Sequence, residues 1–314
     1  MRIAAFTVGN IDVASSRLRS FYLFSIANEF GVYVSRPARF REAFGYDVVH
    51  IQKILSLKII FAIIIYRLGG SKVIFDIDDQ PGTKIISFLG TLAILYLSSV
   101  ITVDSEPRRN YWKKYLFFKS IVVINDVADT VEYNLKIKTR NNTINSTGFF
   151  WIGHSSNIAS IDKFIQFVSL SKIYSLTIST NGNHIQDLQI KYPSINFVPW
   201  TKTVAFQNDI LAKFMILNHD MGKDAQLKSD NKMVLSILSG FIPIVSRTHA
   251  YENLANALNM QHVVFDSQDD VIGIAENINR NKNFISLSNC INYINSNYSR
   301  SAVFSYFISN VLMQ

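Results

Sequence analysis

Short apolar runs alternate with longer amphipathic segments along the whole 314-residue chain. The runs are rich in β-branched residues and end in polar or glycine turns, as buried parallel strands do, whereas the segments between them have helical spacing. This alternation predicts a doubly wound α/β fold. The predicted strands cover residues 3–8, 32–35, 47–51, 73–76, 99–103 and 121–124, and then 148–152, 174–179, 195–198, 215–218, 242–245 and 262–265.

One break in composition divides the two series of strands. Residues 134–147 are mostly Asn, Thr, Lys and Arg with few large apolar side chains, which is typical of a linker. We therefore expect two Rossmann-like domains, at 1–140 and 147–291. Residues 15–30 read as the first long helix, and residues 292–314 as an amphipathic C-terminal helix.

Residues 85–103 carry no charged side chain and are long enough to be scored as a membrane span. Gly90 and the Ser98-Ser99 pair interrupt the run, and its end is β-branched like a strand. The pattern instead predicts a buried or membrane-facing helix at 84–97 followed by a core strand. A second apolar run lies at 59–66. Two such runs in a basic chain fit peripheral contact with an anionic membrane, although core packing is the favoured explanation for most of these residues.

Composition limits the class of protein. Hydrophobic residues make up 48% of the chain and charged residues 17%, which excludes a disordered protein. A single cysteine, Cys290, excludes an internal disulfide and a cysteine metal cluster, and it favours a reducing compartment. The N-terminus has no leader-peptide pattern. We expect a cytoplasmic protein, free or at the cytoplasmic face of the inner membrane. The net charge of +8 indicates an anionic partner.

The segment from Lys228 to Lys232 has the character of an anion site. Its sequence is Lys-Ser-Asp-Asn-Lys, and an amphipathic helix follows it, then Gly240 and an apolar strand. The first N–H groups of a helix lack partners within the helix, its dipole is positive there, and the two lysines add full charges. The alternative is an ordinary αβ unit whose helix starts with a solvated basic turn.

This segment resembles the donor-binding half of bacterial GT-B glycosyltransferases of the family 4 or family 1 kind, which build surface polysaccharides. Further short matches occur in the family's order along the chain. They are Gly9 with Ser15-Ser16-Arg17-Leu18-Arg19, Val73-Ile74-Phe75-Asp76-Ile77-Asp78-Asp79, Val100-Ile101-Thr102-Val103-Asp104-Ser105, Val122-Val123-Ile124-Asn125-Asp126-Val127-Ala128-Asp129 and Phe149-Phe150-Trp151-Ile152-Gly153-His154.

The resemblance implies two Rossmann-like domains that face each other across a cleft, with the C-terminal helix crossing back to the first domain. It implies metal-independent transfer of a sugar from a nucleotide-sugar donor to a lipid-linked or surface glycan, such as lipopolysaccharide, O-antigen or capsule, without a cofactor. The implied donor residues are Gly153, His154, Lys228, Ser229, Asn231, Lys232, Ser246, Ala250 and Tyr251, and those of the first domain's cleft are Gly9, Ser16 and Arg17.

Catalysis would need a group that stabilises the leaving phosphate and, in an inverting enzyme, a base for the acceptor hydroxyl. Lys228 is the candidate for the first role, and Asp78 and Asp79 for the second, because they follow a predicted parallel strand. With Asp76 they could alternatively form a metal site. Arg17 is preferred over Arg19 for the cleft, with Arg19 expected at the surface. His219-Asp220 is a further candidate at the rim.

One family feature is missing. Leu235 stands where many GT-B enzymes have a ribose-binding glutamate. A non-catalytic glycan- or nucleotide-binding subunit therefore remains an alternative to the enzyme. Charge alone suggests a nucleic-acid-binding protein, but the basic residues are scattered and no recognition motif accompanies them, so we expect no nucleic-acid partner.

Overall fold

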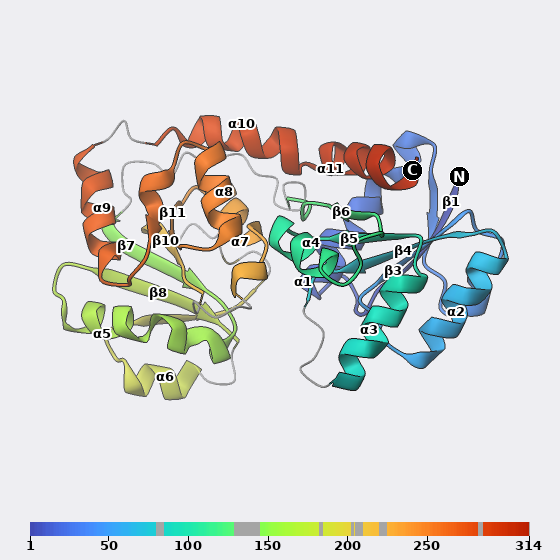
Figure 1. Ribbon diagram of the computed structural model, residues 1–314. Helices are drawn as coiled ribbons and strands as arrows, with labels where there is room; N and C mark the ends of the chain where they lie inside the picture. The colour runs from blue at the N-terminus through green and yellow to red at the C-terminus, as the bar shows by residue number, and fades with distance from the viewer. Residues whose placement is uncertain are drawn as a thin grey trace. The chain divides into compact units, whose positions relative to one another are not determined.

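The computed structural model describes residues 1–79, 85–128, 145–181, 185–201, 204, 210–219, 225–281 and 285–313. They form two parallel six-stranded sheets with helices between the strands (Figure 1). The chain separates into two compact units. The first unit comprises Met1–Asp129, Leu227–Ser229 and Asn295–Gln314, and the second comprises Thr130–Gln226 and Asp230–Ile294. The predicted α/β class with two Rossmann-like domains is confirmed, while most of the proposed linker at 134–147 lies outside the described residues.

The sheet of the first unit has the order β2-β1-β3-β4-β5-β6. All strands are parallel, and the order in which successive strands are added reverses between β1 and β3. Their carboxyl ends therefore form a topological switch point, where open α/β sheets place ligands. The central strands are mostly apolar, as the sequence predicted, while β2 at the edge is only partly buried. The strands are β1 (Arg2–Phe6), β2 (Tyr33–Ser35), β3 (Val48–Gln52), β4 (Lys72–Ile77), β5 (Val100–Val103) and β6 (Ile121–Val123).

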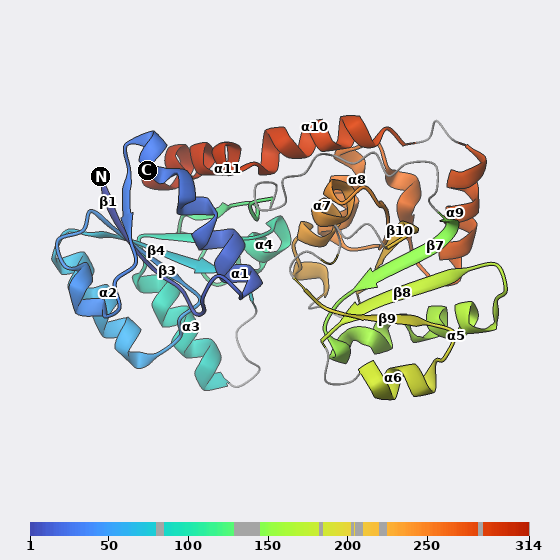
Figure 2. The ribbon, with the colours of Figure 1, turned by 180° about the vertical axis from the view of Figure 1, so that it is seen from behind.

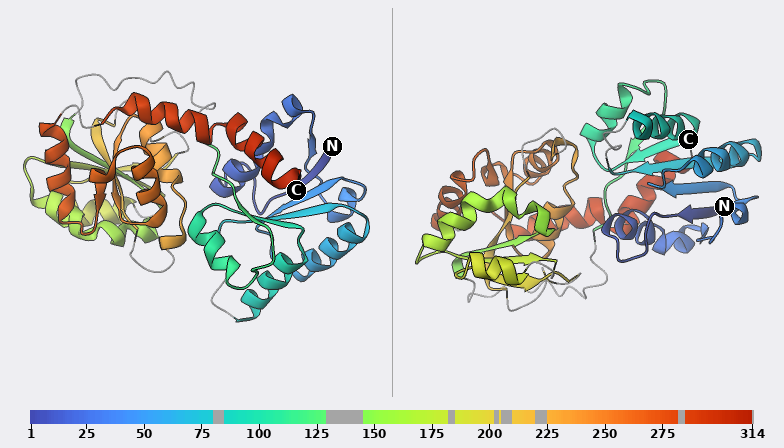
Figure 3. Two further views of the ribbon diagram at one scale, coloured as in Figure 1. Left: turned by 45° about the horizontal axis from the view of Figure 1, so that its top comes forward. Right: turned by 90° about the horizontal axis from the view of Figure 1, so that it is seen from below.

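Helices cover both faces of this first sheet. One face packs against α2 (Leu57–Leu68), α3 (Ile85–Leu97) and α4 (Glu106–Lys113), around a core that includes Ile63, Phe75 and Trp112. The other face packs against the helical segment that follows β1 and against α11 (Arg300–Phe307), which contacts residues 23–30 (Figure 3). Burial on both faces explains why the central strands are mostly apolar.

The first long helix differs from the regular helix predicted at 15–30. It consists of a short α-helical turn, α1 (Ala14–Ser16), a π-helical turn at Arg17–Phe21 and a 3₁₀ stretch at Leu23–Phe30. The Tyr22 amide donates to the Arg17 carbonyl at 2.8 Å, the wide spacing of a π-turn. Single-turn π-bulges are frequent at functional sites.

The uncharged run at 85–103 is a helix, α3, followed by the buried strand β5. The interpretation of this run as helix and strand is therefore confirmed for its described residues; Lys84, the predicted first residue of the helix, lies outside them. No helix in the described parts of the chain combines the length and the apolar character that a membrane crossing requires.

The sheet of the second unit has the order β12-β11-β10-β7-β8-β9, and its switch point lies between β7 and β10. Its helices lie on both faces of the sheet, with α5 and α6 on one side (Figure 2). Its strands are β7 (Asn145–Ile152), β8 (Ser175–Thr180), β9 (Asn196–Pro199), β10 (Ala212–Leu217), β11 (Ile242–Ser246) and β12 (Val264–Phe265). Its helices include α5 (Asp162–Leu170), α6 (Ile185–Lys191), α7 (Asn231–Leu238), α8 (His249–Ala257) and α9 (Asp270–Arg280), and α10 (Leu287–Tyr298) precedes α11.

Candidate active site

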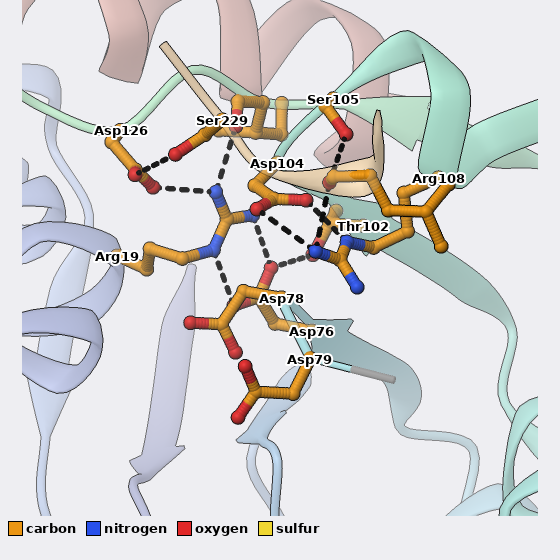
Figure 4. A network of polar contacts seen from close by, with 12 residues as sticks. Arg19, Asp76, Asp78, Asp79, Thr102, Asp104, Ser105, Arg108, Asp126 and Ser229 are labelled. Carbon is orange, nitrogen blue, oxygen red and sulfur yellow. Dashed lines mark hydrogen bonds and ion pairs between the residues drawn. The ribbon is translucent and has the colours of Figure 1, made fainter. Parts of the chain in front are cut away.

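A buried ion-pair network occupies the carboxyl edge of the first sheet (Figure 4). Asp76 belongs to β4, Asp104 follows β5 and Asp126 follows β6, so three neighbouring strands deliver three carboxylates to one edge. Arg19 reaches two of them. Its Nε and Nη2 bind the Asp76 carboxylate at 2.8 and 2.6 Å, and its Nη1 binds Asp126 at 2.9 Å. This two-pronged geometry is the strongest form of a charged hydrogen bond.

The network perturbs the pKa values of its acids in opposite directions. Burial alone would raise the pKa of Asp76, but attraction to Arg19 and the hydrogen bonds of Arg19 hold that pKa below its ordinary value. Burial raises the pKa of Asp104 to about 6, even though Arg108 lies beside it and acts in the opposite direction. Arg108 Nε is 2.5 Å from the Asp104 carboxylate. These buried charges are therefore paired across the sheet edge.

The sequence led us to expect Arg17 in the cleft and Arg19 at the surface. The expectation for Arg19 was wrong, because Arg19 is buried. Arg19 is 3% exposed and lies at the centre of the network. The helix pattern could not show this, since its partners come from strands far along the chain. Arg17 is also buried, and its guanidinium donates to the carbonyls of Ile11 and Asp12 in the loop after β1. Arg17 therefore orders its own loop.

The switch point of the first sheet contains Gly9 and Ser16 from the predicted set. The Gly9 carbonyl accepts a 2.7 Å bond from the Thr7 hydroxyl. Ser16 is fully buried, and so is Gln52 at the end of β3. The side-chain polar atoms of both have no hydrogen-bond partner among the described residues. Buried orphan groups of this kind indicate a ligand or ordered water.

Asp78 and Asp79 lie together after β4, and both pair with Lys53. The Lys53 ammonium is 3.3 Å from Asp78 and also contacts Asp79. Lys53 has a φ of 58°, a left-handed conformation that non-glycine residues rarely adopt, and strained backbone tends to occur at functional sites. Burial raises the pKa of Asp78, with Arg19 acting against that rise. In the described part of the chain, no three His, Cys, Asp or Glu side chains group to hold a metal.

Lys228 lies in the segment that precedes α7, and its side chain is exposed. The residues beside it are bound to the first unit's network: the Ser229 hydroxyl donates to Asp126 at 3.1 Å, and the Leu227 carbonyl accepts from Ser105 and Arg108. The helix itself begins at Asn231 with Asp230 as its N-cap. Lys228 and Ser229 thus lie just outside the helix, and Asn231 is its first residue.

The switch point of the second unit contains Gly153, His154 and Lys232. Gly153 and His154 follow β7, and the Lys232 ammonium reaches from α7 to the Ile152 carbonyl at 3.3 Å. A Cβ on Gly153 would approach the Trp151 ring to 2.5 Å, so the residue must be glycine for the ring to pack. His154 is exposed, and its Nδ1 is 2.9 Å from the Ser156 hydroxyl.

Ser246 and Tyr251 meet His219 at the same switch point. The Tyr251 hydroxyl is 3.0 Å from His219 Nε2, their rings stack at 5.4 Å, and the Ser246 hydroxyl accepts from the His219 amide. Burial raises the pKa of Tyr251, so its phenol stays protonated. Ala250 is buried at the start of α8. These contacts position His219; Asp220 lies outside the described residues.

Sequence reasoning missed several residues of the edge network. Each missed acid follows the end of a predicted strand, and neighbouring parallel strands bring such ends together. That signal, an acid after each of several consecutive strands, was available in the sequence. Lys53 left no such signal, because its left-handed conformation follows from the turn after β3. The missed residues are Arg19, Lys53, Thr102, Asp104, Arg108 and Asp126.

The chain was compared with known proteins. No protein-family model matches it, and no curated protein matches its sequence. Solved structures do match. HepE from Anabaena in complex with UDP aligns over 100% of both chains, with a TM-score of 0.69 and 10% identity. A DNA-modifying β-glucosyltransferase aligns over 99% of both, with a TM-score of 0.62 and 15% identity. TarM aligns over 83% of this chain and 54% of its own, with a TM-score of 0.57 and 11% identity.

These neighbours are GT-B glycosyltransferases, and the match to two of them covers essentially the whole chain. At such low identity the likeness establishes the fold, which is that of the GT-B class: two Rossmann-like units, each with a parallel sheet. The assignment of donor and acceptor residues does not follow from the fold and must rest on the chemistry of the two switch points.

Proposed function

We propose that this protein is a metal-independent glycosyltransferase that uses a nucleotide-sugar donor. The observation that carries the proposal is the full-length likeness to glycosyltransferases solved with UDP. In the proposed reaction the bond between the sugar's anomeric carbon and the phosphate oxygen breaks, and a bond from that carbon to an acceptor hydroxyl forms. The hydroxyl proton passes to a base, and the nucleoside diphosphate leaves as an anion.

The donor part of the proposal rests on two lysines near the start of α7, of which Lys232 is held by the Ile152 carbonyl. Lys228 and Lys232 lie on either side of the N-cap, where the helix dipole adds positive potential. Charge on the leaving phosphate grows in the transition state, so cations held in place stabilise that state more than the ground state. His154, Ser246, Ala250 and Tyr251 complete the proposed donor side: His154 contacts the sugar or phosphate, and the other three shape the switch point around His219.

The acceptor part of the proposal places the base at Asp78 in preference to Asp79. The Asp78 side chain is 11% exposed and that of Asp79 is 51% exposed. Burial raises the pKa of Asp78 toward the working range of a general base, and Lys53 is placed to stabilise its anion. Ser16 and Gln52, with their orphan polar groups, are proposed to bind acceptor hydroxyls at the same edge.

The proposed acceptor is a lipid-linked or surface glycan at the cytoplasmic face of an anionic membrane. Apolar side chains of α2 and α3 point outward: Phe61 is 66% exposed, Leu68 83% and Ile86 82%. Tyr96 of α3 contacts the exposed Phe118, which extends the apolar surface beyond α3. Exposed basic residues accompany it, and such a combination favours anionic lipid. They are Lys58, Arg67 and Lys114.

The donor assignment is tested with purified protein and a panel of UDP, GDP, dTDP and CMP sugars, by measuring binding and nucleotide release. Lys228→Ala should lower turnover with the preferred donor by on the order of a hundredfold to a thousandfold, because it removes a cation that strengthens its contact in the transition state. Lys228→Arg should restore only part of the lost turnover, because a planar guanidinium does not replace a compact ammonium.

Lys172→Ala is the matched control, since Lys172 is an exposed lysine on a loop away from the switch point of the second unit. It should keep the turnover of the original protein. Each variant is checked for an unchanged unfolding midpoint. Normal turnover in a folded Lys228→Ala protein would remove Lys228 from the donor site.

A second candidate function is a non-catalytic binding subunit, and Leu235 favours it. Leu235 is half-buried in α7 and has no group that can accept a hydrogen bond from a ribose hydroxyl through its side chain. Such a subunit would bind a nucleotide or glycan without releasing nucleotide. A mobility-shift assay tests whether the chain binds DNA, because an α-glucosyltransferase neighbour was solved with UDP and a DNA 13-mer.

A further inference from the structure

The two residues that flank the exposed Lys228, Leu227 and Ser229, are both held by hydrogen bonds. Before it, the Leu227 carbonyl accepts two bonds, from Ser105 Oγ at 3.0 Å and from Arg108 Nη2 at 2.9 Å. After it, Ser229 Oγ donates to Asp126 Oδ2 at 3.1 Å. All of these groups belong to the first unit. Figure 4 shows Ser229 beside Asp126, with Ser105 and Arg108 at the same edge of the sheet.

Arg108 and Asp126, which hold this segment, are themselves held by buried ion pairs. Arg108 is 2% exposed and is bound to Asp104, and Asp126 is 9% exposed and is bound to Arg19. Arg19 is anchored in turn by Asp76, whose carboxylate also accepts from Thr102 at 2.6 Å. Hydrogen bonds to ionised groups are shorter and stronger than neutral ones. The segment is therefore attached to a rigid part of the sheet edge.

The bond to Asp126 also limits what Ser229 can do. A hydroxyl has a single proton, and here it points to a carboxylate. Phosphate oxygens need a donor, and the remaining lone pairs of this hydroxyl cannot supply one. The geometry thus argues against Ser229 as a direct phosphate ligand, which is the role that the sequence suggested.

We propose that Ser229, Asp126 and Arg108 are positioning residues that hold Lys228 in a fixed place before the donor arrives. This inference rests on the proposed function, which puts Lys228 on the leaving phosphate. A mobile segment must be ordered during the reaction, whereas the backbone of a preorganised segment is ordered when the protein folds, which leaves only the lysine side chain to be ordered. Misplacement by about 1 Å can cost on the order of a hundredfold in rate.

A double-mutant cycle between Ser229→Ala and Lys228→Ala tests this coupling. Ser229→Ala alone should lower kcat by about tenfold with little change in KM, because the lysine is present but misplaced. Ser229→Thr, which keeps a hydroxyl, should recover most of the loss. In the Lys228→Ala background, Ser229→Ala should have no further effect. Losses that multiply in the double variant would overturn the proposal.

Ser71→Ala is the matched control. Ser71 is a buried serine of the same unit whose hydroxyl donates to the Tyr46 carbonyl at 2.7 Å, at the opposite end of β4 from the network. It loses one comparable hydrogen bond without touching the segment. Its kcat should stay unchanged. A loss equal to that of Ser229→Ala would show a general stability effect and would also overturn the proposal.

Trypsin gives a readout that does not depend on activity, because it cleaves after Lys228. Cleavage at an exposed site whose neighbours are hydrogen-bonded requires local unfolding that breaks those bonds. Asp126→Asn and Arg108→Lys weaken the fastening without altering the cleaved bond, so each should raise the cleavage rate after Lys228 by about tenfold under native conditions, relative to cleavage at the other sites. An unchanged cleavage rate would show that Asp126 and Arg108 do not hold the segment in place.

The two kinds of failure are distinguishable. If Lys228→Ala keeps full turnover, the proposed donor role fails and the positioning role fails with it, whatever the proteolysis shows. If Lys228→Ala loses turnover but the cleavage rate or the mutant cycle contradicts coupling, the proposed function stands and only the positioning role fails.

Discussion

At the scale of single residues, His50 shows what burial does to a titratable group. The imidazole is 1% exposed and packs against the rings of Phe24 and Phe307, at centroid distances of 5.0 and 6.2 Å. Burial lowers the pKa of His50 to about 4, with Asp76 acting in the opposite direction. A folded protein at neutral pH therefore holds this imidazole uncharged.

This shift predicts a loss of stability in acid. Between pH 6.5 and pH 4 the unfolded chain binds a proton at His50 and the folded chain does not, so the free energy of unfolding falls as pH falls. A shift of this size corresponds to about 3 kcal/mol. His50→Phe, which fits the aromatic surroundings and cannot titrate, should lack the part of this stability loss that is due to His50. Urea unfolding at a series of pH values measures the free energy of unfolding of both proteins.

The comparison with the unaltered protein isolates His50, because other acid-sensitive groups occur in both. The pKa of Asp76 is held low by Arg19, so its protonation also destabilises the fold in acid. The part of that contribution that is due to Arg19 cancels in the difference, while the electrostatic coupling between His50 and Asp76 is counted with His50. Equal slopes for the two proteins between pH 6.5 and pH 4 would mean that His50 is protonated in the folded state.

At the scale of elements, the strands were predictable and the contacts between their ends were not. The predicted strand at 73–76 is β4 (Lys72–Ile77), and its buried face reads directly as an apolar run. By contrast, Arg19 is separated from Asp76 by 57 positions and from Asp126 by 107. A local pattern carries no information about partners at such separations. The π-turn at Arg17–Phe21 was missed for a related reason, because its hydrogen-bond register does not change the pattern of apolar positions.

The candidate site could be predicted only in part. The acids after β4 were found because a polar residue at the carboxyl end of a buried strand stands out in the sequence. Lys232 was a candidate because a basic segment precedes an amphipathic pattern in the sequence, and it lies in the first turn of α7. The role of Ser229 as a tether to Asp126 was not, since the same Lys-Ser sequence serves equally well for phosphate binding or for a loop attachment.

The element-scale prediction concerns the bridge that Arg19 makes between the π-turn and two strand ends. Arg19→Met should reduce the free energy of unfolding by about 3 to 5 kcal/mol, because it leaves Asp76 and Asp126 buried without their cation. Arg109→Met is the control: its pair with Glu106 is exposed and should contribute less than about 1 kcal/mol. Urea denaturation compares the two. Similar small losses would show that the buried carboxylates are accommodated without Arg19.

At the scale of the whole molecule, charge and apolar exposure suggest the same partner. The chain carries a net charge of +8. The outward apolar side chains of α2 and α3 lie on helices whose inner faces, with Ile63 and Leu95, are fully buried in the first unit. Core packing therefore explains the inner faces of these helices and leaves the outer faces unexplained. Large exposed apolar patches on a protein usually mark an interaction surface.

The whole-molecule prediction is that the protein binds vesicles containing acidic lipid and does not bind neutral ones. Each exposed leucine or phenylalanine that enters the lipid contributes about 1.5 to 3 kcal/mol, and each basic residue near an anionic surface about 1 kcal/mol. Binding should weaken between 0.1 M and 1 M salt, where the screening length falls from about 10 Å to about 3 Å. Co-sedimentation with vesicles of matched size measures both effects.

Paired variants decide whether α2 is the surface that meets the lipid. Leu68→Glu changes a leucine that is 83% exposed in α2, and Leu170→Glu changes one that is 89% exposed in α5 of the second unit. Both add the same negative charge to the chain, so any difference reflects position. Leu68→Glu should weaken binding by about tenfold or more, because it replaces a contributing leucine with a repelled carboxylate, and Leu170→Glu should change it little. Equal losses of vesicle binding in the two variants would mean that the effect depends only on net charge. Equal co-sedimentation of the unaltered protein with acidic and neutral vesicles would mean that α2 and α3 have no membrane role.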